Sequence, residues 1–322
     1  MRSLLNQGRK RLGWTTLWVP SYFCQTVLRD LEPEGIAVRA YGDSPLDGER
    51  EPIRIENESR GAILTLNPFG LRSRMRPLDI DRSRMSVIED HTHDPWSPLV
   101  QSSIADYCIA SLRKTIPIPD GGILWSPQLL ARPSPPLPTE ERTGASAEKL
   151  AGMALKHLYL TGRVAEKTTF RELVLSGEER IASGEVSGMP FITRTLLTGF
   201  NAAEWRKRRS ENYRVLIDAL GGLPNLKPLS PSSADAVPFG AVLVLPSARC
   251  RTDLRQRLIE SNVYPALLWS MESPAIDGIR PADLDLSRRS LFLHCDGRYG
   301  PKDMTRLAKI VSGRFAEVGC GT

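Results

Sequence analysis

Residues 86–122 constrain the fold of this chain more than any other segment. They contain two short, largely apolar runs, at 86–88 and 105–111, with the length and composition of buried strands. Acids and histidines follow the first run, and basic residues and a Pro-Asp-Gly-Gly turn follow the second. Ligands of a parallel α/β sheet collect beyond the carboxyl ends of its strands. We therefore expect a carboxylate and an amine from these two strand ends to meet in one site.

This segment resembles the active-site segment of pyridoxal-phosphate enzymes with the aspartate-aminotransferase fold, and most closely that of the DegT/DnrJ/EryC1/StrS sugar-aminotransferase family. In that family an Ile-Glu-Asp strand end supplies the carboxylate for the cofactor's pyridine nitrogen, and Asp90 matches it. Three residues later a Gln or His lies near the phenolic oxygen, where His93 stands. The family's Ser, Schiff-base Lys and Gly-Glu-Gly-Gly turn are matched by Ser111, Lys114 and residues 119–122, with a shorter Ser-to-Lys spacing.

A second resemblance lies near the amino terminus. Residues 20–24 resemble the family's Pro-Ser-Phe-Thr-Phe segment, so Tyr22 or Phe23 is expected to stack on the cofactor ring. In the family a Gly-Ser/Thr turn that opens a helix binds the phosphate just before this strand. Here the helix expected before Pro20 starts at Met1, so its N-terminal turn is missing. We therefore expect either an N-terminally truncated member or one that holds the phosphate differently, and in both cases weak retention of the cofactor.

The residue types suit pyridoxal-phosphate chemistry. A lysine that condenses with an aldehyde must spend time as a neutral amine. A carboxylate beside the pyridine nitrogen keeps it protonated, so the ring can act as an electron sink. The resemblance implies an aminotransferase that uses an amino acid donor and a keto sugar or similar acceptor, through a Lys114 aldimine. The lysine favours this activity over the family's dehydratase branch, in which a histidine replaces it.

Two other functions stay open at this point. The missing phosphate turn favours a catalytically impaired scaffold or partner subunit with the same fold. The net charge of +6 is compatible with a nucleic-acid binder, but the arginines are dispersed and no run of five basic residues occurs. We expect no nucleic-acid partner and no membrane partner, because no apolar run is long enough to cross a bilayer.

The expected architecture is α/β. It has a mostly parallel sheet flanked by helices in a large cofactor-binding domain (residues 1–199) and a smaller C-terminal α+β domain (residues 200–322). Residues 200–220 predict a long helix whose Arg-x-x-Asn-Tyr pattern resembles the family's interdomain helix. Arg298, after a C-terminal strand, is a candidate to bind an anionic part of the substrate. The cleft of this fold lies at a twofold interface, so the resemblance implies a homodimer.

The remaining expectations concern cysteines, metals and local structure. Five scattered cysteines without a CxxC pair predict reduced thiols in a cytoplasmic protein. His91 and His93 lie between acids, but alternate residues at a strand end rarely bind a metal alone, so no metal is expected. Residues 126–147 predict an extended loop and 264–269 a strand. The arginines between residues 72 and 84 predict a solvated face.

Overall fold

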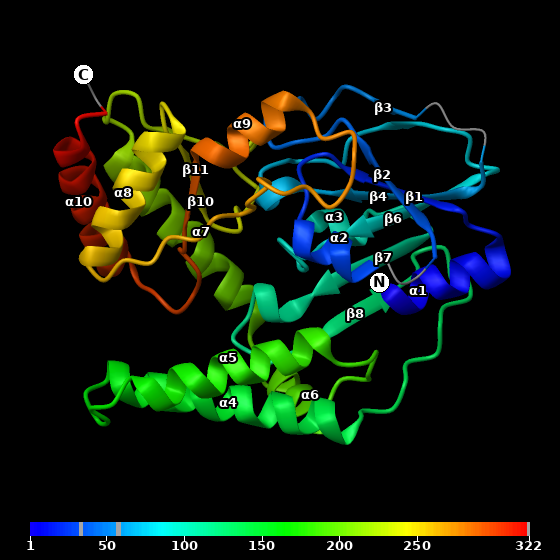
Figure 1. Cartoon of the computed structure of the whole chain (residues 1–322), viewed down its shortest axis with the longest axis horizontal. Helices are drawn as coiled ribbons and strands as arrows, with labels where there is room; N and C mark the ends of the chain where they lie inside the picture. Colours follow the sequence, from blue (N-terminus) through cyan, green and yellow to red (C-terminus); the bar gives the residue numbers. More distant parts are fainter. Residues whose placement is uncertain (32–34, 56–58, 321–322) are drawn as a thin grey trace.

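A six-stranded sheet organises the computed structural model, which describes residues 1–31, 35–55 and 59–320. The strand order is β2-β1-β4-β6-β7-β8. All neighbours pair in parallel except β7 and β8, which are antiparallel, so the predicted mostly parallel sheet is confirmed (Figure 1). The strands are β1 (Thr16–Pro20), β2 (Ala37–Tyr41), β4 (Gly61–Leu66), β6 (Met85–Asp90), β7 (Tyr107–Ser111) and β8 (Gly122–Trp125).

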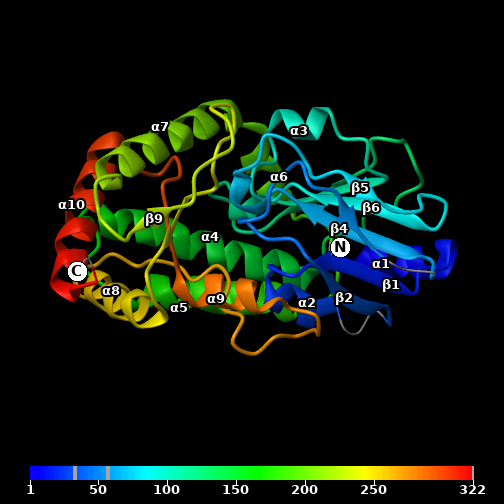
Figure 2. The ribbon, with the colours of Figure 1, turned by 90° about the horizontal axis from the view of Figure 1, so that it is seen from above.

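Both faces of this sheet are covered, which is why its central strands are apolar along their whole length. All six residues of β4 are buried. Leucines of α1 (Arg2–Gln7) and α2 (Gln25–Leu31) pack on one face, and η1 (Gly8–Leu12) continues α1. The other face packs against residues of the small parallel pair β3 (Ile53–Arg54) and β5 (Leu78–Asp79) (Figure 2).

The C-terminal part is a smaller α+β unit, as the sequence predicts. Its antiparallel sheet has the order β11-β10-β9, with β9 at Lys227–Pro228, β10 at Ala241–Val244 and β11 at Ser290–Leu293. One apolar core joins this sheet to α7 (Ala202–Leu220), α8 (Ala248–Glu260) and α10 (Pro301–Val318). Asn201 caps α7, since its Oδ1 accepts from the Glu204 N–H. The domain boundary at residues 199 and 200 stays a prediction.

Between β8 and α7 the chain forms a helical hairpin that makes a layer of its own, at the bottom of Figure 1. Its helices are α4 (Glu140–Leu160) and α5 (Thr168–Ser183), followed by α6 (Phe191–Thr198). The prediction of a loop over residues 126–147 is correct only up to Thr139. The Thr139 hydroxyl accepts from the Arg142 N–H, and two acids follow in the first turn, so the helix begins at Glu140.

Two further predictions about secondary structure and cysteines are wrong. Residues 264–269 form no strand, because only Ala266 bridges to Phe292, and α9 (Pro281–Arg289) follows unpredicted. Cys250 and Cys320 form a disulfide rather than two reduced thiols. Packing of α8 beside α10 brings the two Cα atoms to 6.0 Å across a sequence separation of 70, which no local pattern reveals. Cys24, Cys108 and Cys295 are free.

The predicted solvated face is also wrong at two of its arginines. Arg72 and Arg76 are only 5% and 8% exposed, and both pair with the buried Asp43, at 2.6 and 2.9 Å. Arg280 at the start of α9 pairs with Asp47, in the same loop as Asp43. The pair of Arg280 with Asp47 joins the C-terminal unit to the loop after β2, and Arg72 and Arg76 hold the same loop from within the large domain. The arginines therefore have a structural use that the charge pattern does not reveal.

A glycine at the start of β4 permits the close approach of β1. A Cβ on Gly61 would lie 2.4 Å from the Thr16 carbonyl oxygen. We expect Gly61→Ala to lower the free energy of unfolding by about 2 kcal/mol, because strand backbones cannot yield cheaply. Gly313→Ala, where an added methyl on α10 meets nothing, should raise it by roughly 0.5–1 kcal/mol. Urea unfolding checks both, and equal effects would contradict this packing.

Candidate functional site

Thr92 ties together the two strand ends that the sequence predicts to carry the site. Its N–H donates to Oδ1 of Asp90 (2.8 Å), as in an Asx-turn. Its hydroxyl accepts from the Ser111 N–H (2.9 Å), and its carbonyl accepts from the Thr115 hydroxyl (2.7 Å). One residue therefore links the carboxylate after β6 to the turn after β7. Sequence reasoning missed it, and the only local signal was a hydroxyl residue between His91 and His93.

Lys114 ends a 3-10 turn, η4 (Leu112–Lys114), that directly follows β7. Leu112 and Ile116 are buried, and the Thr115 carbonyl accepts from Nε1 of Trp205 on α7 (2.8 Å), so the turn is held from both sides. The Lys114 side chain itself is exposed. Its ammonium forms no hydrogen bond or ion pair with any residue that the structure describes.

The electrostatic surroundings favour the neutral form of this lysine. Although its tip reaches solvent, the surrounding protein removes part of its hydration, which is the main cause that lowers the pKa of Lys114. The positive charge of Arg113 lowers this pKa further, whereas Cys24 and Glu178 act in the opposite direction. A lysine in such surroundings is a better nucleophile than an ordinary surface lysine.

His93 is held as a neutral hydrogen-bond donor. The Phe69 N–H donates to Nδ1 of His93 at 2.9 Å, so Nδ1 is unprotonated and the ring proton lies on Nε2. The imidazole stacks against the rings of Phe69, Phe239 and Trp269, with centroids 5.0–5.7 Å away. This burial lowers the pKa of His93. Among the described residues, Nε2 has no hydrogen-bond partner.

Backbone strain at Phe69 makes this arrangement possible. Phe69 is fully buried and has φ +54°, a left-handed conformation that a bulky residue adopts only at a cost of about 1–3 kcal/mol. It lies in η3 (Pro68–Gly70), the short turn that follows β4. The Phe239 N–H donates to its carbonyl (2.7 Å), which holds the strained residue in place. The strain directs the Phe69 N–H at His93.

Asp90 ends β6, and His93 and Lys114 follow the neighbouring parallel strands β6 and β7, so all three belong to the carboxyl edge of the sheet. The charges of Asp90 and Lys114 both act on the His93 imidazole, the first raising its pKa and the second lowering it. Oδ1 of Asp90 is taken by Thr92, and no hydrogen bond is formed by Oδ2 within the described residues. These residues offer a carboxylate oxygen, an imidazole donor and an amine at this edge of the sheet. Ser111, half-buried at the end of β7, lies next to this group.

The aromatic residues expected to stack on a cofactor are engaged elsewhere in the protein. Tyr22 is 1% exposed, and its hydroxyl donates to the Leu268 carbonyl at 2.7 Å. Phe23 is buried in the core beneath α1 and α2. The following residue, Cys24, is the one whose sulfur lies close enough to act on Lys114. The stacking of Tyr22 or Phe23 on a cofactor stays a prediction.

Arg298 is not joined to the other candidates by any contact among the described residues. It pairs with Asp296 at 2.6 Å and its guanidinium lies over the Tyr299 ring. The resemblance of α7 to an interdomain helix has a structural counterpart beside it. Asn212 donates to the carbonyls of Asp296 and Tyr299, so α7 holds the turn that carries Arg298. The substrate-binding role of Arg298 stays a prediction.

Three possible metal ligands, Glu89, His91 and Cys108, lie on the other face of the sheet from Asp90. Their ligand atoms are within 4.8 Å of one another. Each already has a protein partner, because His91 and Glu89 bond to each other (3.0 Å) and Cys108 contacts Ser103. Burial raises the pKa of the Cys108 thiol to about 12, so the thiolate that a metal requires is disfavoured.

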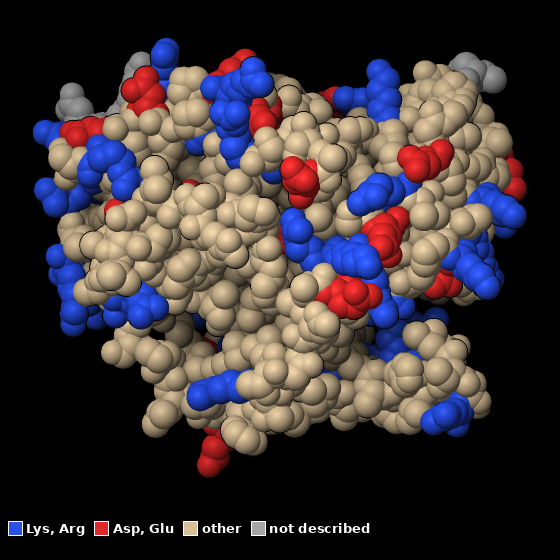
Figure 3. All heavy atoms as spheres, turned by 180° about the vertical axis from the view of Figure 1, so that it is seen from behind, with Lys and Arg blue, Asp and Glu red and all other residues tan. Residues whose placement is uncertain are grey.

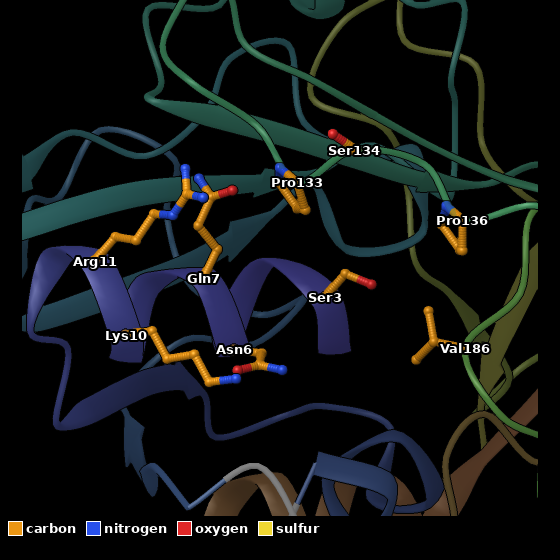
Figure 4. Close-up of a pocket in the computed structure, with 9 residues that line it drawn as sticks. All are labelled: Ser3, Asn6, Gln7, Lys10, Arg11, Pro133, Ser134, Pro136 and Val186. Carbon is orange, nitrogen blue, oxygen red and sulfur yellow. The ribbon is translucent and has the colours of Figure 1, made fainter.

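Two hollows of the described surface are lined by none of Asp90, His93 and Lys114. One, of about 380 Å³, lies between α1 and residues 133–136 (Figure 4). The other, of about 400 Å³, is lined by residues 45–51 and by four residues of neighbouring loops. On the face in Figure 3 basic and acidic side chains are interspersed. None of the described helices has the length and apolarity of a membrane span.

No protein-family model matches the chain, and no curated protein matches its sequence. Solved structures do match. TlmJ, an aminotransferase from Streptoalloteichus hindustanus, is 15% identical with a TM-score of 0.61, over 99% of this chain and 84% of that chain. The putative sugar aminotransferase Spr1654 from Streptococcus pneumoniae, in its PMP form, is 10% identical with a TM-score of 0.63, over 98% and 86%. The chain has the sugar-aminotransferase fold.

Other structures with this fold agree with that assignment. A 3-amino-5-hydroxybenzoic acid synthase is 14% identical with a TM-score of 0.60, over 98% of this chain and 85% of that chain. The fold expected from the motifs in residues 19–24 and 87–122 is therefore confirmed. In a chain with the sugar-aminotransferase fold, Asp90, His93 and Lys114 are candidate cofactor-binding residues.

A buried ion pair anchors the loop after His93 to α7. Asp94 accepts from Arg209 (2.8 Å) and from Arg206 (2.9 Å), and the Arg209 side chain is 1% exposed. We expect Asp94→Asn to lower the free energy of unfolding by roughly 3–5 kcal/mol, because the buried guanidinium of Arg209 then lacks a negatively charged partner. Glu204→Gln removes an exposed pair with Arg208 and should cost at most about 0.5 kcal/mol. Urea unfolding compares the two variants. A loss of stability in Asp94→Asn as small as that in Glu204→Gln would contradict the role of Asp94 as a buried anchor of α7.

His93 should also make stability depend on pH. Its folded-state pKa lies below the ordinary 6.5, so below that pH the unfolded chain binds a proton that folded His93 does not. The stability it contributes is therefore present above pH 6.5 and is lost as the pH falls through 6.5 toward its folded pKa. The difference in unfolding free energy between the native chain and His93→Gln should narrow over this window. A difference that is constant or widens on acidification would refute a neutral buried His93.

Proposed function

We propose that this chain is a pyridoxal-phosphate-dependent aminotransferase that transfers an amino group from an amino acid to a keto sugar or similar carbonyl compound. The observation that supports the proposal is that Asp90, His93 and Lys114 all belong to the carboxyl edge of the sheet in a chain with the sugar-aminotransferase fold. Spr1654 is known in PLP and PMP forms, which supports the choice of cofactor. The keto-sugar acceptor rests on the names of the structural neighbours.

The available side-chain atoms fit this cofactor. Lys114 would bind its aldehyde covalently, and the free oxygen of Asp90 would accept from its pyridinium N–H. Nε2–H of His93 would donate to its phenolic oxygen, since Nδ1 is already occupied by the Phe69 N–H. Ser111 is the residue we assign to the phosphate. When bound, pyridoxal phosphate supplies an electron sink for the carbanion at the substrate's reacting carbon.

The surroundings of each residue account for its task. Lys114 has a lowered pKa and an exposed tip, so it can be a neutral amine that moves a proton at the reacting carbon. Thr92 fixes one oxygen of Asp90 and so turns the other toward the ligand. Phe69 keeps His93 in the one neutral tautomer that donates from Nε2. None of these tasks requires a metal ligand.

Three finer parts belong to the same proposal. We propose a homodimer, because the exposed Lys114 needs cover from water during catalysis, and a second chain over the sheet edge would provide it. We retain Arg298 as the substrate-binding arginine. The third part is a cytoplasmic location, which is supported by the free cysteines and is not favoured by the Cys250–Cys320 disulfide. Light scattering tests the oligomeric state.

The alternative, a catalytically impaired scaffold with the same fold, is favoured by one observation. Tyr22 and Phe23 are buried by core packing, which leaves little of either ring exposed for a cofactor to stack on. A scaffold of this kind would keep the fold and the ion pairs of α7 but would not hold the cofactor. Covalent capture of pyridoxal phosphate separates the two functions.

The test is reductive trapping. Incubation with pyridoxal phosphate and borohydride should add one pyridoxyl group, mapped by mass spectrometry to Lys114 and absent in Lys114→Arg, which keeps the charge. Exposed Lys302 reports non-specific reaction. Asp90→Asn should still be trapped, but amino transfer should fall by about 10²–10⁴-fold. Labelling of Lys302 and Lys114 to the same extent, or no labelling, would overturn the aminotransferase and leave the scaffold.

A further inference from the structure

A carboxylate from the α4–α5 hairpin reaches the turn that carries Lys114. Glu178 on α5 forms direct ion pairs with Arg113 of η4 and with Lys149 of α4. The side chains of Arg113 and Lys149 are 21% and 10% exposed and that of Glu178 is 38% exposed, so the two cations are more shielded from water than the carboxylate that holds them. This is a direct polar link between the hairpin and the lysine turn, and the cofactor-binding roles proposed above make no use of it.

Helix packing fixes the carboxylate where it is. Gly177, beside Glu178, lies so close to α4 that an added Cβ would be 2.7 Å from Cβ of Lys149 and 2.9 Å from the Ala145 carbonyl oxygen. The hairpin therefore holds Glu178 and Lys149 in one relative position. Arg113 bonds to the second oxygen of Glu178, so its guanidinium is held against the hairpin beside its sequence neighbour Lys114.

We propose that Arg113, anchored by Glu178, is a positioning residue that keeps Lys114 in its neutral, nucleophilic form. The proposal rests on the proposed function in one respect, that Lys114 is the reactive amine. A cation held beside an amine disfavours protonation of that amine, which is a known way to activate a lysine nucleophile. Glu178 holds Arg113 through hydrogen bonds while the paired Lys149 offsets its negative charge.

The charged groups around Lys114 come from five elements. Arg113 precedes it on η4, Glu178 and Lys149 face it from α5 and α4, Asp90 and His93 lie beyond β6, and Cys24 follows β1. The hairpin side holds two cations and one carboxylate, so its net charge is positive. Arg113 acts to lower the pKa of Lys114, second only to burial, and Glu178 and Cys24 act to raise it. Removal of Arg113 takes away a cation that disfavours protonation of Lys114. It also leaves the negative charge of Glu178, which favours that protonation, less neutralised.

The experiment measures the protonation of Lys114 without any cofactor. Trace acetic anhydride acetylates only neutral amines, so the pH midpoint of labelling, read by mass spectrometry for each lysine, reports its protonation. In the native chain Lys114 should have a lower midpoint than exposed Lys302. Arg113→Gln should raise the Lys114 midpoint by about one unit, and Arg113→Lys should restore most of the difference. Lys302 should not change in either variant.

Arg180→Gln is the matched control, because Arg180 pairs with Glu148 in the same hairpin and has no contact with η4. It should leave the Lys114 midpoint unchanged. An unchanged midpoint in Arg113→Gln, or an equal rise in Arg180→Gln, would overturn the inference. Borohydride trapping of pyridoxal phosphate tests the proposed function independently. If borohydride traps no pyridoxal phosphate but Arg113→Gln still raises the Lys114 midpoint, the inference about Arg113 stands and the proposed aminotransferase function fails.

Discussion

The hydrogen bonds of Thr92 are the constraint on which the candidate site depends. Parallel strands bring their carboxyl ends to one edge, but they leave the loops beyond them free to diverge. Thr92 removes that freedom, because its amide, hydroxyl and carbonyl bond to Asp90, Ser111 and Thr115. A carboxylate and an amine from separate strands thus keep a common orientation. The short turn η4 after β7 extends this order to Lys114.

A second set of contacts determines the protonation of His93 and Lys114 rather than their position. The strained Phe69 directs its N–H at Nδ1 of His93, and the surrounding aromatic rings exclude water, so the imidazole is neutral and donates from Nε2. On the other side, Arg113 and burial disfavour the protonated form of Lys114. His93 is therefore a hydrogen-bond donor, and Lys114 holds its proton less tightly than an ordinary lysine does. The same surroundings explain why the fold tolerates strain at Phe69.

The C-terminal unit contributes by holding these loops rather than by adding reactive groups. Asp94, one residue after His93, is buried under two arginines of α7, and Asn212 of that helix binds the turn at Arg298. In the large domain, Arg72 and Arg76 follow β4, and both pair with the buried Asp43, which follows β2. Buried charges are costly unless paired, so these pairs restrict how the sheet and the C-terminal unit can be arranged.

Local sequence patterns determined much of this protein. The apolar runs predicted the strands β6 and β7 and the long helix α7, and the polar residues at the ends of those strands made Asp90 and Lys114 the site candidates. Only the tertiary structure decided the tautomer of His93, set by Phe69 24 positions away, and the Glu178 contact to Arg113 across 65 positions. The physical reason is that periodicity and caps report interactions between near neighbours. Contacts between distant segments depend on how packed helices and strands cross, which no single segment encodes.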